Sequence, residues 1–67
     1  MKMKIDATLK AESNNKVKIF NLTDTIEGST RADIIETAKA MIYTKATKYY
    51  NNSIQYAEFK VNYSYAV

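Results

Sequence analysis

The sequence contains no cysteine and no histidine, and its seven acidic residues are scattered along the chain. Without cysteine there are no disulfide bonds, and without cysteine or histidine a structural zinc site loses its usual ligands. The acidic residues do not have the spacing of a calcium-binding loop. The commonest general bases and nucleophiles are missing as well. We therefore expect a non-enzymatic protein with no metal and no cofactor.

Long apolar runs are also missing. No stretch approaches the roughly 20 apolar residues that are needed to cross a bilayer. The first ten residues alternate in character, whereas a signal peptide has a continuous apolar segment. We expect a cytoplasmic protein with no membrane partner.

At 67 residues the chain has room for one small α+β domain covering residues 1–67. A chain of this length buries only about 60% of the surface that its unfolded form exposes. Small folds that lack disulfides and metals are often reinforced by self-association. We therefore expect a homo-oligomer, with the monomer as the alternative.

Two N-terminal segments predict a β-hairpin. Residues 2–10 alternate strictly between apolar and polar side chains, which is typical of a strand with one buried face. Residues 11–15 are a polar cluster rich in turn formers, and alternation resumes at residues 16–19.

The second strand changes phase along its length. Phe20 and Leu22 are out of phase with Val17 and Ile19. This change predicts a bulge, a strand end or apolar side chains on both faces. Phe20 and Leu22 are therefore candidate contacts between subunits.

A helix of about 18 residues is predicted after Gly28, with Ser29 or Thr30 as its N-cap. Asn51 and Asn52 supply its end, because asparagine tolerates the left-handed backbone common there. Apolar residues recur at three- and four-residue spacing. They are Ile34, Ile35, Ala38, Met41, Ile42, Ala46 and Tyr49.

A second long alternation, within residues 53–67, predicts a third strand. One side of that strand is apolar and consists of Ala57, Phe59, Val61, Tyr63, Tyr65 and Val67. The predicted fold is a two-layer ββαβ arrangement with a three-stranded antiparallel sheet of order 2-1-3. We expect the helix to cover the apolar sides of all three strands.

The other face of this sheet is predicted to be rich in lysine. It would present Lys2, Lys4, Lys10, Lys16, Lys18 and Lys60. With a net charge of +3, such a face is a candidate surface for nucleic acid. Only Tyr56, with Phe20 if a bulge turns it outward, would offer a ring for base stacking. The alternative is a solvated face whose lysines prevent aggregation.

Two smaller candidate sites follow from the same elements. Gly28, Ser29, Thr30 and Arg31 form a candidate anion site at the helix N-terminus, for which simple capping is the alternative explanation. Tyr43 and Tyr50 lie off the main apolar stripe and, with Phe20 and Leu22, are candidate interface residues. The alternative is a partly wet core edge.

These features favour a non-enzymatic interaction or inhibitor-type accessory protein that binds or sequesters a protein partner. The composition would suit a protein encoded by a phage or mobile element. A nucleic-acid-binding protein that uses the lysine face is the first alternative. A binder of a small anionic ligand such as a nucleotide is the second.

Overall fold

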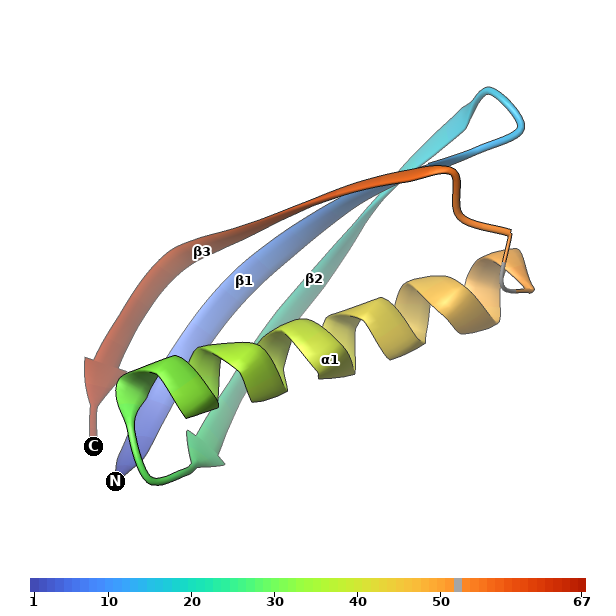
Figure 1. Ribbon diagram of the computed structural model, residues 1–67. Coiled ribbons are helices and arrows are strands. Elements are labelled where there is room, and N and C mark those ends of the chain that lie inside the picture. The colour runs from blue at the N-terminus through green and yellow to red at the C-terminus, as the bar shows by residue number, and fades with distance from the viewer. Residues whose placement is uncertain (52) are drawn as a thin grey trace.

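The computed structural model describes residues 1–51 and 53–67, which form three strands and one helix (Figure 1). Along the chain these are β1 (Lys2–Ser13), β2 (Lys16–Glu27), α1 (Arg31–Tyr50) and β3 (Tyr56–Ala66). The sheet is antiparallel with the order β2-β1-β3, and α1 lies along one of its faces. The predicted α+β fold and its strand order are confirmed. The face opposite α1 is called the open face below.

The hairpin turn is shorter than the polar cluster suggested. β1 continues to Ser13 and β2 begins at Lys16, so only Asn14 and Asn15 connect them. Both asparagines have left-handed backbone angles, with φ of 53° and 65°. A two-residue hairpin turn of type I′ requires positive φ at both central positions, and asparagine tolerates it well. This turn sets the register of β2 against β1.

That register corrects the phase assigned to β2. Phe20, Leu22 and Ile26 face α1 and are buried, whereas Val17 and Ile19 lie on the open face. The pairing of β1 with β2 runs without a shift from Ser13 opposite Lys16 to Lys2 opposite Glu27. Of the predicted alternatives, the bulge and the strand end are wrong, and apolar side chains on both faces are confirmed: the whole strand has one phase, with Val17 and Ile19 on its outward side.

The ends of α1 are capped as the sequence suggested. The Thr30 hydroxyl accepts a hydrogen bond from the backbone N–H of Asp33 at 3.2 Å. At the other end Asn51 adopts a left-handed conformation, and its N–H donates to the Thr47 carbonyl. The predicted N-cap at Thr30 and the predicted stop at Asn51 are confirmed. Asn52, the second residue of the predicted stop, lies outside the described residues.

The buried stripe of α1 is narrow. It consists of Ile34, Ala38, Ile42 and Ala46, each with no exposed surface. Two other residues of the predicted stripe, Met41 and Tyr49, are 36% and 60% exposed. A stripe with one buried residue every fourth position can contact only a narrow part of the sheet.

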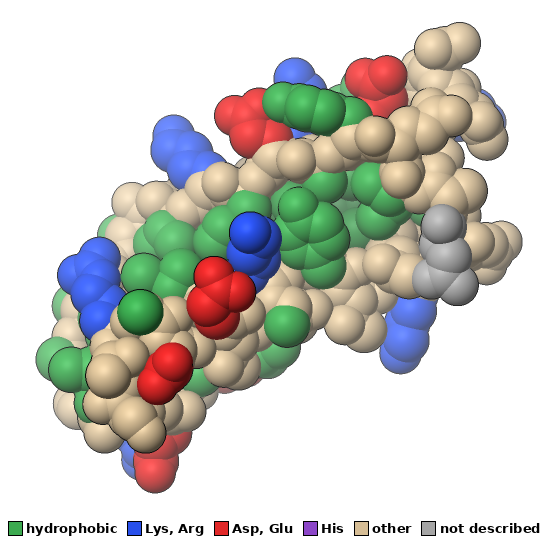
Figure 2. All heavy atoms as spheres, viewed as in Figure 1, with side chains coloured by type: hydrophobic (Ala, Val, Ile, Leu, Met, Phe, Trp, Pro, Cys, Tyr) green, Lys and Arg blue, Asp and Glu red, His purple; other side chains and the backbone are tan. Residues whose placement is uncertain are grey.

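Because the stripe is narrow, α1 packs against β1 and β2 and leaves β3 largely uncovered. Ala57, Phe59 and Val61 do lie on the helix side of β3, as predicted, but each stays only half-buried at the margin of the core. Figure 2 shows hydrophobic side chains along the side of the molecule between β3 and α1. The expectation that the helix covers all three strands is therefore wrong for β3.

Candidate binding face of the sheet

The open face is built from alternate residues of the three strands, which lie in rows across the sheet. From the hairpin turn to the other end these rows are Val17, Glu12 and Tyr56; Ile19, Lys10 and Glu58; Asn21, Thr8 and Lys60; Thr23, Asp6 and Tyr63; Thr25, Lys4 and Tyr65; and finally Glu27 and Lys2. The face thus combines aliphatic, aromatic and charged side chains.

A β-bulge decides which residues of β3 reach this face. Ala7 is opposite Val61, but the preceding residue Asp6 is opposite Tyr63, so Asn62 is an extra residue in β3. The extra residue shifts the alternation by one position. Tyr63 and Tyr65 therefore point to the open face, and the prediction that they lie on the helix side is wrong. No sequence feature other than a polar Asn in an alternating run signalled the bulge.

Hydrogen bonds hold the bulge and the middle of the open face. The Asn62 amide donates to the Asp6 carboxylate at 3.2 Å and to the Thr8 hydroxyl at 2.7 Å. Thr23 donates to the other oxygen of Asp6 at 2.6 Å, and Thr8 donates to the Asn21 side chain at 3.3 Å. The network joins all three strands. The centre of the open face is consequently a fixed polar patch.

Exposed apolar and aromatic groups lie on either side of this polar patch. Toward the hairpin turn are Val17, Ile19 and Tyr56, which are 51%, 57% and 57% exposed. Toward the other end are Tyr63 and Tyr65, about half exposed, whose rings stack with centroids 6.1 Å apart. Rings and aliphatic groups that already stand exposed on a strand lose little freedom on binding, which suits them to contact a partner.

The open face carries no excess of positive charge. Its lysines are Lys2, Lys4, Lys10 and Lys60. Its carboxylates are Asp6, Glu12, Glu27 and Glu58. The formal charges of the face therefore cancel, and the chain's net charge of +3 lies on the helix side of the molecule.

Lys16 and Lys18 are on the helix side, so their predicted placement on the open face is wrong. They are opposite Ser13 and Ala11, which face α1, because the two-residue turn sets the phase of β2. The Lys18 ammonium lies 4.9 Å from the centre of the Tyr49 ring. Lys45, one turn before Tyr49, donates to the Asn21 carbonyl at 3.2 Å. Lys18 thus lies over an exposed aromatic ring on the helix side.

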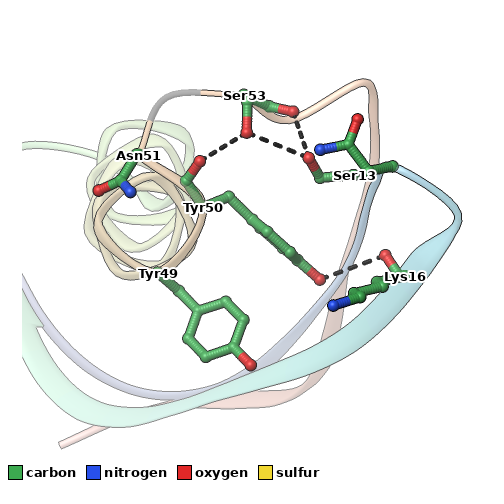
Figure 3. Close-up of a pocket in the computed structure, with 7 residues that line it drawn as sticks. Ser13, Lys16, Tyr49, Tyr50, Asn51 and Ser53 are labelled. Atoms are coloured by element: carbon green, nitrogen blue, oxygen red, sulfur yellow. Dashed lines mark hydrogen bonds between the residues drawn. The ribbon is translucent and has the colours of Figure 1, made fainter.

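An open hollow of about 560 Å³ lies beside this group, where the end of α1 meets the hairpin (Figure 3). Its lining includes Ser13, Lys16, Tyr49, Tyr50 and Ser53. The Ser13 hydroxyl donates to the Ser53 carbonyl at 2.6 Å, and the Ser53 hydroxyl donates to the Tyr50 carbonyl at 2.6 Å. These bonds tie the end of α1 to β1.

Tyr50 links the end of α1 to the hairpin through its hydroxyl group. Its hydroxyl donates to the carbonyl of Lys16 at 3.3 Å, with the Ala11 carbonyl at 3.5 Å. Burial raises the pKa of the Tyr50 hydroxyl above its ordinary value, and the nearby Tyr49 and Glu12 raise it further. The shift keeps the hydroxyl a hydrogen-bond donor to higher pH than in a free tyrosine.

The other predicted interface residues are only partly available to a partner. Phe20 and Leu22 are 9% and 7% exposed and belong to the chain's own core. Tyr43 is half-buried and packs against that core. The burial of Phe20 and Leu22 follows from the corrected phase of β2, which removes both from the surface.

At the helix N-terminus two of the four residues of the predicted anion site, Gly28 and Thr30, have local structural explanations. The Thr30 hydroxyl is occupied by Asp33 N–H, and Gly28 N–H donates to the Met1 carbonyl at 3.0 Å. A Cβ atom at Gly28 would lie 2.9 Å from Cγ1 of the buried Ile34, which favours glycine there. Ser29 and Arg31 are exposed. Anion binding stays a prediction.

Comparison with known protein families, curated proteins and solved structures finds no match to this chain. In residues 1–51 and 53–67 no group of three acidic side chains gathers as metal ligands. Over the same residues no helix is both long and apolar enough to cross a bilayer.

Proposed function

We propose that the chain is a non-enzymatic binding protein that recognises a protein partner with the open face of its sheet. The observation that supports this most is the combination of exposed tyrosine and aliphatic groups with a hydrogen-bonded polar centre, on a face whose formal charges cancel. Tyrosine is enriched in protein interfaces and often contributes strongly to binding. A phosphate backbone, in contrast, requires an excess of lysine or arginine.

The position of the hollow favours a protein over a small molecule as the partner of the open face. Small ligands usually occupy concave pockets that cover most of their surface. The hollow described above lies on the helix side, away from the open-face rows. A partner would therefore contact a ridge of Tyr63 and Tyr65, the polar centre and the group formed by Val17, Ile19 and Tyr56.

The double variant Tyr63→Ala/Tyr65→Ala tests this proposal. We expect each ring to contribute about tenfold to affinity, as interface tyrosines commonly do. The immobilised variant should lose proteins that the wild-type chain retains from a lysate of its source cells. Quantitative mass spectrometry of the retained proteins measures this loss, and titration of the purified partner gives the change in Kd.

Tyr49→Ala is the matched control, because it removes an exposed tyrosine from the opposite side of the molecule. Circular dichroism checks that all variants are folded. If all three proteins retain the same set, the open face does not bind the partner and the proposal is wrong.

A second candidate function is nucleic-acid binding on the helix side. The chain's whole net charge lies on that side, where the Lys18 ammonium lies 4.9 Å from the centre of the exposed Tyr49 ring and Lys16 lines the same hollow as Tyr49. Lysines beside a ring that can stack on a base are the usual elements of a single-strand binding site. This candidate replaces the lysine face predicted from the sequence.

Charge reversal on each side of the sheet distinguishes nucleic-acid binding on the helix side from binding on the open face. Lys18→Glu should weaken binding of a fluorescently labelled single-stranded oligonucleotide and lower the slope of log K against log salt by about 1. Lys4→Glu on the open face is the matched control and should leave binding unchanged. Fluorescence anisotropy over a salt series measures both. An oligonucleotide affinity that is unchanged in Lys18→Glu would contradict this candidate. So would the absence of oligonucleotide binding by the wild-type chain at low salt.

A further inference from the structure

β3 is an edge strand whose outer side has no partner in the sheet of order β2-β1-β3. An edge strand offers a row of unpaired backbone N–H and C=O groups, to which another strand can be added. Proteins usually block such edges with lysine, proline, a bulge or a covering element. In β3 the bulge begins only at Asn62, which leaves residues 56–61 regular, with Lys60 as the one blocking side chain.

The same segment carries uncovered apolar surface. Ala57, Phe59 and Val61 face the helix side but stay half-buried, because α1 packs on β1 and β2. The opposite edge strand differs. Phe20, Leu22 and Ile26 on the helix side of β2 are already buried, so a strand added there would cover little more of that row. On the helix side, β3 is therefore the edge at which pairing would bury new apolar surface.

The charges of β3 suit a second copy of the same strand. In an antiparallel pair related by a two-fold axis, directly opposite residues share a face, so the axis must pass through a residue. With the axis at Phe59, Glu58 lies opposite Lys60 of the second copy, and Lys60 lies opposite Glu58. Opposite charges in this position stabilise a strand pair.

Neighbouring registers of this strand pair are less favourable. An axis at Glu58 places Glu58 opposite itself, and an axis at Lys60 places Lys60 opposite itself, which is destabilising in both cases. An axis at Ala57 would extend the pairing beyond the start of β3, and an axis at Val61 would run it through the bulge. Within the regular segment only the axis at Phe59 pairs unlike charges.

We propose that two copies of the chain pair through residues 56–61 of β3, as antiparallel strands about a two-fold axis at Phe59. The two sheets then form one continuous six-stranded sheet. On the helix side Phe59 lies opposite Phe59 and Ala57 lies opposite Val61, so the two uncovered apolar rows join between the helices. This dimer is independent of the partner proposed for the open face.

Charge exchange at the axis tests the dimer and its register together. In Glu58→Lys, each of the two opposite pairs formed by positions 58 and 60 consists of two lysines. In Lys60→Glu, each of these pairs consists of two glutamates. Each single variant should weaken the dimer about tenfold or more. The double variant Glu58→Lys/Lys60→Glu restores unlike pairs and should return the Kd close to that of the wild type. Sedimentation equilibrium measures the dimer Kd for each protein.

Matched controls make the same charge changes on exposed positions of α1. Glu36→Lys and Lys39→Glu lie on the helix and should leave the dimer Kd unchanged. A wild-type chain that stays monomeric at millimolar concentration overturns the proposal. A double variant as weak as the singles, or singles as tight as the controls, overturns it too.

A cross-linking experiment tests the axis independently. The sequence has no cysteine, so one introduced thiol is unique. Opposite residues in a strand pair lie close enough for a disulfide, so Phe59→Cys should form a covalent dimer under mild oxidation. Tyr56→Cys is the control, because its two copies would be about 20 Å apart along the paired strands. Equal cross-linking of both variants, or faster cross-linking through position 56, contradicts the axis at Phe59.

Discussion

Ile42→Ala is expected to leave most of the chain unfolded at room temperature. Ile42 has no exposed surface and is one of the four largest fully buried side chains, with Ile5, Leu9 and Ile34. Truncating a buried isoleucine to alanine typically costs about 2 to 5 kcal/mol. A core of this size rarely contributes more than about 3 to 5 kcal/mol of net stability. One substitution can therefore remove nearly all of it.

Urea unfolding followed by far-ultraviolet circular dichroism measures this effect. Met41→Ala is the matched control, since Met41 precedes Ile42 on the same helix but is 36% exposed. We expect the control to lower the free energy of unfolding by well under half as much as Ile42→Ala. Both measurements belong at low micromolar concentration, where self-association contributes least. Equal effects of the two substitutions would contradict the orientation of α1.

Ala38→Leu is expected to destabilise the chain for the opposite reason. Ala38 and Ala46 allow α1 to lie close to the sheet, and in β1 the fully buried Ala7 and Ala11 are equally small. Additional carbon atoms in a well-packed core typically cost about 1 to 3 kcal/mol. The larger side chain would lift the helix or push the strands apart, which a small core tolerates poorly.

Ala40→Leu separates this crowding from helix propensity. Ala40 lies on the exposed side of α1, and leucine is nearly as good a helix former as alanine. Its melting temperature should stay close to that of the wild type, whereas that of Ala38→Leu should fall by several degrees. A stable Ala38→Leu variant would mean that the helix is not packed tightly on the sheet.

The two proposed surfaces are compatible with each other. Pairing through β3 joins two sheets side by side, so both open faces would lie on the same side of the dimer. A partner with two matching sites could then bind both faces, and its affinity would rise through effective concentration. Breaking the dimer with Glu58→Lys would then weaken capture of such a partner, and the double variant Glu58→Lys/Lys60→Glu, which changes the same open-face charges but keeps the dimer, should restore it. Tyr63→Ala/Tyr65→Ala would weaken capture without changing the dimer Kd.

The candidate sites were harder to predict than the fold. The lysines of β1 and Lys60 lie on the open face as expected, but Lys16 and Lys18 do not. Lys16 and Lys18 were assigned to the open face because Val17 and Ile19 were taken as the buried side of β2. That choice was ambiguous, since β2 has apolar residues on both sides. Alternation shows which residues share a face but not which of the two faces is covered.

The sequence by itself determined the elements and their order. Alternation marked the strands, and the three- and four-residue spacing of apolar residues from Ile34 to Tyr49 marked the helix. The caps at Thr30 and Asn51 depend on short-range hydrogen bonds, so they could be predicted from local sequence.

Only the tertiary structure decided on which face of the sheet each side chain lies. The turn at Asn14 and Asn15 set the phase of β2, and the bulge at Asn62, held by Asp6 and Thr8 from another strand, turned Tyr63 and Tyr65 outward. The narrow helix stripe left the apolar row of β3 half-exposed. Each of these depends on contacts between residues far apart in the chain, which a local pattern does not encode.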